Sequence, residues 1–293
     1  MKRLYFIIAI ACLSLLACSS DDDNGNSGGT AKTKVGTLDK ESSTRVKSVG
    51  DITYYYNEDG SLNYFSIIGS KFTFSTPYKL VETSRDGTEK YSGTINYNSS
   101  GNIVHIDGTF NYKEGSTTVT GSDTYSFNYD GSQHLTSFDY SETDTYRGEV
   151  HKLSESSTIT WKNNMLIQVV REERESDNDL DADHFRMTFK YGYNDTLIND
   201  FHNVHHQYAQ TVDRFLEDGL LRALAYVGLL GRGPLYLPES CTKTEENVLD
   251  TNDKVYTNTY SFSYGFNSNG SLSYAAIGSS RQNYTYEQIS QKE

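Results

Sequence analysis

A short motif recurs along this chain and limits the folds that it can adopt. An aromatic residue is followed by Asn, two variable residues and Gly, and an apolar or aromatic residue stands two positions before it. Such alternation places apolar side chains on one face of a β-strand. Because Asn bonds to its own backbone and Gly accepts a positive φ, the segment suits a hairpin turn. The copies span residues 56–60, 97–101, 127–131 and 266–270.

The last copy shows the whole unit. Residues 260–266 alternate aromatic side chains with Ser and Gly, and residues 272–277 supply a return strand. Looser copies stand at 159–166 and 187–195. Repeated short units of this kind indicate stacked or meandering hairpins, and their irregular spacing favours a meander over a strict solenoid. We therefore predict a mainly β protein built as an antiparallel hairpin meander.

Tyrosine is abundant in this chain, with 24 copies, while the apolar fraction is only 35%. Since Tyr can bury its ring and keep its hydroxyl in water, this composition favours a thin or curved sheet over a thick two-layer core. Aromatic side chains also contact sugars and peptides, so some are candidate ligand-binding residues, with core packing as the alternative role. The candidates are Tyr54, Tyr56, Tyr64, Trp161, Tyr264 and Tyr274.

One stretch, at about 201–230, has a helical pattern. Its apolar residues recur at intervals of three and four, Gly219 interrupts it, and Gly and Pro end it. An amphipathic helix in a β protein is expected either to cover an open apolar face or to plug a barrel. The apolar stripe consists of Val204, Tyr208, Val212, Phe215, Leu216, Leu220, Leu224 and Val227.

The start of the chain predicts where in the cell the protein is located. Two basic residues precede an apolar run over 4–16, as in a secretory signal peptide, and the run ends in a Leu-Leu-Ala-Cys sequence that resembles the bacterial lipobox. Cys18 would then be acylated and insert into outer-membrane lipid; an ordinary signal peptide with a chance Cys is the alternative. The acidic residues 21–23 resemble a surface-export signal. We expect a signal peptide over 1–17, a flexible tether over 18–50 and one β-rich domain over 51–293.

Charge and cysteine content restrict the function classes. The formal net charge of −13 argues against nucleic-acid binding. Cys12 leaves with the signal peptide and Cys18 carries lipid, so Cys241 has no intramolecular disulfide partner. Packing or a bound ion must then stabilise the fold.

Two stretches carry side chains that could bind a metal ion. Acidic residues alternate over 171–184, and oxygen ligands of this type suit Ca²⁺, although a solvated, self-repelling loop is the favoured interpretation. His202 and His206 stand four apart on one helix face and could bind Zn²⁺, although a polar helix start is favoured there. Otherwise we expect no cofactor. The acidic candidates are Asp177, Asp179 and Asp181.

The sequence contains no nucleophile elbow, P-loop, dinucleotide-binding fingerprint or Cys-x-x-Cys pair, so we do not expect an enzyme. The leading hypothesis is a binding module for a glycan, peptide or protein. A structural or interaction protein of the cell envelope without a small ligand is the alternative, and a hydrolase is the least supported.

Taken together, the lipobox, the aromatic-Asn-x-x-Gly hairpins, the helical stretch, the Gly-Leu-Leu-Gly of 228–231 and the Leu-Pro-Glu-Ser of 237–240 resemble a family of Bacteroidetes lipoproteins. It is domain-of-unknown-function family 4595, and the resemblance covers about 51–277. It implies a curved or closed, porin-like antiparallel barrel, with no assigned catalytic or ligand residues. Because Ser, Thr, Lys and Glu interrupt the expected strands, we expect a barrel in water, held at the outer membrane through Cys18, rather than a membrane-spanning one.

Overall fold

The computed structural model describes residues 44–76, 78–177, 180–193, 216, 219–234, 236–250, 254–268 and 272–288. These ranges hold sixteen strands and one helix, α1 (Gly219–Tyr226). The strands are β1 (Thr44–Val49), β2 (Ile52–Tyr56), β3 (Leu62–Ile67), β4 (Ser70–Thr76), β5 (Lys79–Thr83), β6 (Glu89–Tyr97), β7 (Ile103–Glu114), β8 (Thr117–Tyr129), β9 (Leu135–Tyr146), β10 (Glu149–Lys162), β11 (Met165–Asp177), β12 (Leu180–Gly192), β13 (Ser240–Asn247), β14 (Tyr256–Phe266), β15 (Leu272–Ile277) and β16 (Ser280–Gln288).

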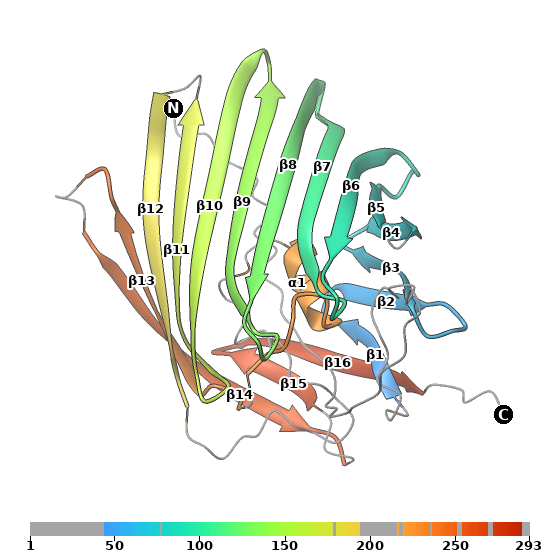
Figure 1. Cartoon of the computed structure of the whole chain (residues 1–293), viewed down its shortest axis with the longest axis vertical. Coiled ribbons are helices and arrows are strands. Elements are labelled where there is room, and N and C mark those ends of the chain that lie inside the picture. The colour runs from blue at the N-terminus through green and yellow to red at the C-terminus, as the bar shows by residue number, and fades with distance from the viewer. Residues whose placement is uncertain are drawn as a thin grey trace.

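The strands form an antiparallel barrel, as the hairpin pattern and the family resemblance predicted, and of the two forms expected, curved or closed, the structure shows the closed one (Figure 1). Each strand pairs with its neighbours in sequence, and β1 pairs with β16 to close the sheet. Val46 and Val49 of β1 are buried, and Arg45 binds Glu287 across the closing pair at 2.7 Å. Because β1 lies within the expected tether over 18–50, the folded domain begins before residue 51, the expected boundary.

Turn chemistry explains why the hairpins form where they do. In the first copy, the Asn57 amide donates to the Ser61 carbonyl at 2.8 Å, the Gly60 amide donates to the Asn57 carbonyl, and Gly60 has a φ of 87°. The second copy repeats this geometry with Asn98 and Gly101. Glycine occupies the left-handed position at no steric cost, as expected.

Two turns differ from the motif. In the third copy the loop opens at Asp130, whose carboxylate accepts the Ser132 and His134 amides, and Gln133 takes the left-handed position with a φ of 67°. The turn therefore lies two residues later than the motif placed it. Ser84 opens an equivalent turn that the motif missed, with a Gly87 φ of 86°. A side-chain oxygen that accepts a loop amide is the shared feature. Asn98 and Asp130 supply it from the first loop position, whereas Asp59 and Asp86 supply it from the third position of the turns that begin at Asn57 and Ser84.

An aromatic belt links neighbouring strands at the motif turns. The aromatic at the end of one strand donates its O–H or N–H to a backbone carbonyl at the start of the preceding strand. Tyr129 reaches Ile103 at 2.5 Å, and Trp161 reaches Leu135 at 2.8 Å. These bonds satisfy carbonyls that would otherwise be unpaired at strand ends. The belt consists of Tyr56, Tyr129, Trp161, Tyr193, Tyr264 and Tyr286.

Helix α1 and the turn after it plug the belt end of the barrel. The helix lies inside the ring of strands (Figure 1), and the Tyr54 hydroxyl donates to the Ala223 carbonyl at 3.2 Å. After the helix, the Leu229 carbonyl accepts the Ile103 amide, and the Arg232 amide donates to the Gln133 carbonyl. Of the two expectations for the helical stretch, a plug is confirmed for 219–230, whereas residues 201–215 lie outside the described part.

The other end of the barrel carries the long hairpins. Strands β7 to β12 extend well beyond α1, as Figure 1 shows in its upper half. Two of their tips lie between β7 and β8 and between β9 and β10, and Asp177 at the end of β11 pairs with Leu180 at the start of β12. Within the described ranges, no helix combines the length and apolar character needed to cross a membrane.

Candidate functional site

The long strands have two different faces. On β10, exposed positions alternate with less exposed ones, and the buried members Ser157 and Ile159 lie on the face that contacts the core. In a closed barrel the core face is the inner face, so register assigns every partner of these residues to the inside. The inner surface of β9 to β12 can therefore be followed row by row.

The inner rows change from apolar to acidic with distance from the plug. Nearest the plug, Ile159 pairs with Val169; the next row holds Phe138, Ser157, Arg171 and Met187. Tyr140, Glu155, Glu173 and Phe185 follow, then Glu142, Leu153, Glu175 and Asp183, and finally Asp144, His151 and Asp177. We call the carboxylates of these last three rows the acidic wall: Glu142, Asp144, Glu155, Glu173, Glu175, Asp177 and Asp183.

Some carboxylates of the acidic wall have basic neighbours. Arg171, with only 3% of its side chain exposed, binds Glu155 at 2.6 Å and Glu173 at 2.7 Å. His151 contacts Asp177 at the far end of the wall. A buried guanidinium needs such partners, because an unpaired buried charge is costly. Arg171 thus partly neutralises the row of Glu155 and Glu173.

Other carboxylates of the wall repel one another. Burial raises the pKa of Glu175, and the nearby carboxylates of Glu173, Asp183 and Asp177 raise it further. Burial and Asp177 likewise raise the pKa of Asp144. Both directions mean that the ionised forms are destabilised where they lie. Groups of this kind cluster at functional sites.

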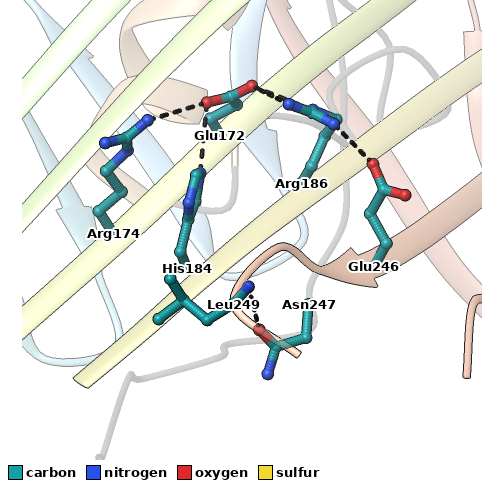
Figure 2. Close-up of polar contacts among 7 residues, drawn as sticks. All are labelled: Glu172, Arg174, His184, Arg186, Glu246, Asn247 and Leu249. Atoms are coloured by element: carbon teal, nitrogen blue, oxygen red, sulfur yellow. Dashed lines mark hydrogen bonds and ion pairs between the residues drawn. The ribbon is translucent and has the colours of Figure 1, made fainter. Parts of the chain in front are cut away.

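The outer face of β11 to β13 is also polar, and its charged side chains form ion pairs with one another (Figure 2). Glu172 of β11 accepts hydrogen bonds from Arg186 at 2.9 Å and His184 at 3.3 Å, and Arg186 also binds Glu246 of β13 at 2.9 Å. Arg174 lies 3.5 Å from Glu172. On β10 the outward positions are exposed, and apart from Val150 they are Lys, Ser and Thr. This surface suits water rather than lipid chains, which require an apolar outer band.

The structure does not bring the six candidate aromatics together. Tyr54 is fully buried in the core, so it presents no binding surface. Tyr64 lies on the outer face, stacked on Tyr55 at 4.2 Å, and Tyr274 lies under Arg281. The other three candidates belong to the belt, where their polar atoms bind backbone: Tyr56, Trp161 and Tyr264.

Within the acidic stretch over 171–184, residues 171–177 and 180–184 are not a loop, as composition had suggested, but belong to β11 and β12. Asp177 ends β11, whereas Asp179, His202 and His206 lie outside the described residues, as does the side chain of Asp181. No group of three or more His, Cys, Asp and Glu side chains in the described ranges is arranged to hold a metal ion. Cys241 is buried in β13.

Sequence reasoning missed most of the acidic wall, yet a signal for it exists. Asn163 and Asn164 form a tight turn with φ values of 51° and 58°. Counting equally along both strands from that turn would pair residues 151–157 with 170–176, and a bulge between Thr160 and Trp161 shifts the partners by one, to 171–177. Alternation then puts Glu155, Glu173 and Glu175 on the face of the core residues.

Comparison with known proteins supports the fold. No family model and no curated protein matches the chain. A porin-like protein from Bacteroides vulgatus is similar in structure, with a TM-score of 0.55 and 12% sequence identity over 83% of this chain and 98% of that one. A porin-like protein from Bacteroides uniformis, 14% identical over 74% of this chain and 95% of its own, gives a TM-score of 0.25, which supports no statement about fold. This chain therefore shares the closed-barrel fold of a Bacteroides porin-like protein, while membership in family 4595 stays a prediction.

Proposed function

We propose that this protein is a non-catalytic binding module, anchored at the outer membrane through an acylated Cys18, and that the acidic wall contacts its ligand. The lipobox and the acidic residues after it support this location at the outer membrane. The polar outer face of β10 to β13 supports a barrel in water, held by its lipid rather than inserted. The sequence carries no recognised catalytic motif, so we propose binding rather than chemistry.

The placement of charge is the observation that carries the proposal. A barrel needs apolar side chains inside for stability, and here they fill the plug end. Beyond the plug, ionisable groups replace them on the inner face, where burial makes each charge costly. Residues that conflict with stability in this way are typical of functional sites, because function is what retains them. The belt end is occupied by α1, so we propose that the ligand enters from the far end.

A thermal-shift screen of the full-length acylated protein in a mild detergent tests this function. The panel contains neutral oligosaccharides, peptides and polycations. A ligand at a hundred times its Kd stabilises by about 2.7 kcal/mol, which corresponds to a Tm rise of about 5–10 °C for a protein of this size.

Two variants locate the site. Asp144→Asn/Glu175→Gln alters the wall, and Asp139→Asn/Glu246→Gln alters the outer face with the same change of net charge. Asp139 is exposed on β9, the strand that also carries Asp144. We expect the wall variant to abolish the shift and the outer variant to keep it. A ligand that stabilises both variants equally would place binding elsewhere and refute the proposal.

A further inference from the structure

We infer that the ligand of the acidic wall is a basic peptide segment, whose Lys or Arg side chains bind the carboxylates while a backbone carbonyl accepts a hydrogen bond from Ser157. The inference rests on the proposed function, since it names the ligand class of the same site. Three features of the described residues carry it: the spacing of the carboxylates, their unmet charge, and a buried hydroxyl without a partner.

The spacing of the carboxylates matches that of an extended peptide. Glu173, Glu175 and Asp177 occupy alternate positions of β11 on the inner face. With a rise of about 3.3–3.4 Å per residue, successive carboxylates are about 7 Å apart along the strand, as are alternate side chains of an extended peptide. On β9, Glu142 and Asp144 repeat this interval. The carboxylates of the wall are thus spaced like the alternate side chains of an extended basic peptide.

The negative charge of the wall is only partly balanced. No described residue donates a hydrogen bond or forms an ion pair with Glu175, and one buried carboxylate oxygen of Asp144 has no partner in the described structure. The groups that act on Glu175 are the carboxylates of Glu173, Asp183 and Asp177, with His151 opposing them. A bound ammonium or guanidinium group would relieve this repulsion, as charge-assisted hydrogen bonds to carboxylates are strong.

Ser157 supplies an independent observation. Its side chain is only 3% exposed and lies on the inner face, at the depth where the acidic wall meets the apolar rows. Its hydroxyl has no hydrogen-bond partner among the residues that the structure describes. Buried polar groups are nearly always paired, so this one marks a place for a ligand atom.

The neighbour of Ser157 indicates which atom that is. Arg171 pairs with Ser157 in register. Its positive charge disfavours a second cation at this depth and favours an oxygen acceptor. A backbone carbonyl meets that requirement, whereas a linear polyamine has no such atom. The wall and Ser157 together therefore favour a peptide over other polycations.

Titration calorimetry on the full-length acylated protein at low salt tests the inference. Acetyl-tetralysine amide and spermine carry the same number of charges, but only the peptide has carbonyl groups. We expect the wild-type protein to bind the peptide at least tenfold more tightly than spermine. Asp144→Asn/Glu175→Gln should weaken peptide binding at least tenfold, and Asp139→Asn/Glu246→Gln should change it less than about twofold.

Ser157→Ala separates the two parts of the site. Because the hydroxyl has no partner, the variant should fold at least as stably as the wild type. It should weaken peptide binding about tenfold and leave spermine binding unchanged. Equal affinity for spermine and the peptide would overturn the peptide assignment, as would an unchanged peptide affinity in Ser157→Ala.

A neutral oligosaccharide in the same titrations separates the basic-peptide inference from the proposed binding function. If it binds in a manner that depends on the wall while the peptide does not bind, the basic-peptide inference fails and the proposed binding function stands. If every bound probe is insensitive to the wall variant, both fail.

Discussion

Replacing Leu224 by Ala tests whether α1 is packed as a plug. Leu224 is fully buried, and its neighbours Ala223, Ala225 and Tyr226 are at most 1% exposed, so little can move to fill the space. Buried Leu-to-Ala changes cost about 2–5 kcal/mol, and a site that cannot collapse lies above the minimum. We expect a loss of about 3–4 kcal/mol in the free energy of unfolding, or a Tm lower by roughly 6–15 °C.

The chain contains its own probe for this measurement. Trp161 is its single tryptophan, and its ring stacks on His134 at 4.3 Å, near the plug end. Urea unfolding followed by its fluorescence gives the free energy and the m-value. Leu249→Ala is the control, since Leu249 is 53% exposed and should change stability by no more than about 0.5 kcal/mol. If Leu224→Ala costs as little as the control, the plug does not support the barrel and the reasoning is refuted.

Three further variants test other parts of the structure. Gly231→Ala should cost about 2 kcal/mol or more by thermal unfolding, because Gly231 has a φ of 85° and an added Cβ would lie 2.4 Å from a carbonyl oxygen of the β8–β9 turn; an unchanged Tm would contradict this packing. Since burial raises the pKa of Asp144 and Glu175, the folded state holds their protons more tightly than the unfolded state, and stability is lost as pH rises through the folded pKa values. Asp144→Asn/Glu175→Gln should therefore raise the Tm at pH 7.5 and flatten its decline between pH 4 and 8; a lower Tm at pH 7.5 would oppose this sign. Glu246→Gln should change stability by less than about 1 kcal/mol, with the difference vanishing in 1 M NaCl, because its ion pair is exposed; a salt-independent loss would contradict it.

The hairpins were predictable because their cause is local. A side-chain oxygen that accepts a loop amide and a residue that tolerates positive φ lie within a few positions of each other, as at Asp59 and Gly60. Closure was not predictable from local pattern, and the family resemblance left a curved and a closed sheet as alternatives. β1 has two buried residues, Val46 and Val49, and its partner lies at the opposite end of the chain. Because β1 contains so few buried apolar residues, its local composition is typical of a flexible tether.

The site was less predictable than the fold. Alternation predicts that Tyr54 and Tyr56 lie on one face of a strand and Tyr55 on the other. It does not predict which face meets the core, or which hydroxyl donates a hydrogen bond to a backbone carbonyl. Charge density made 171–184 look like a solvated loop, because strands seldom carry so many acids. Only the pairing outward from the turn at Asn163 places Glu173 and Glu175 inside the barrel.

The aromatic belt has a consequence for how such barrels change in size. Four of its bonds span nearly the same stretch of chain, 26 or 27 residues, and each joins a strand to the one before it. A hairpin with its belt residue is thus a module whose ties reach only its predecessor. Duplication or loss of one module would preserve these ties and the antiparallel closure while altering the circumference, since barrel diameter grows with strand number. Barrels of this kind can therefore evolve wider or narrower interiors in steps of two strands.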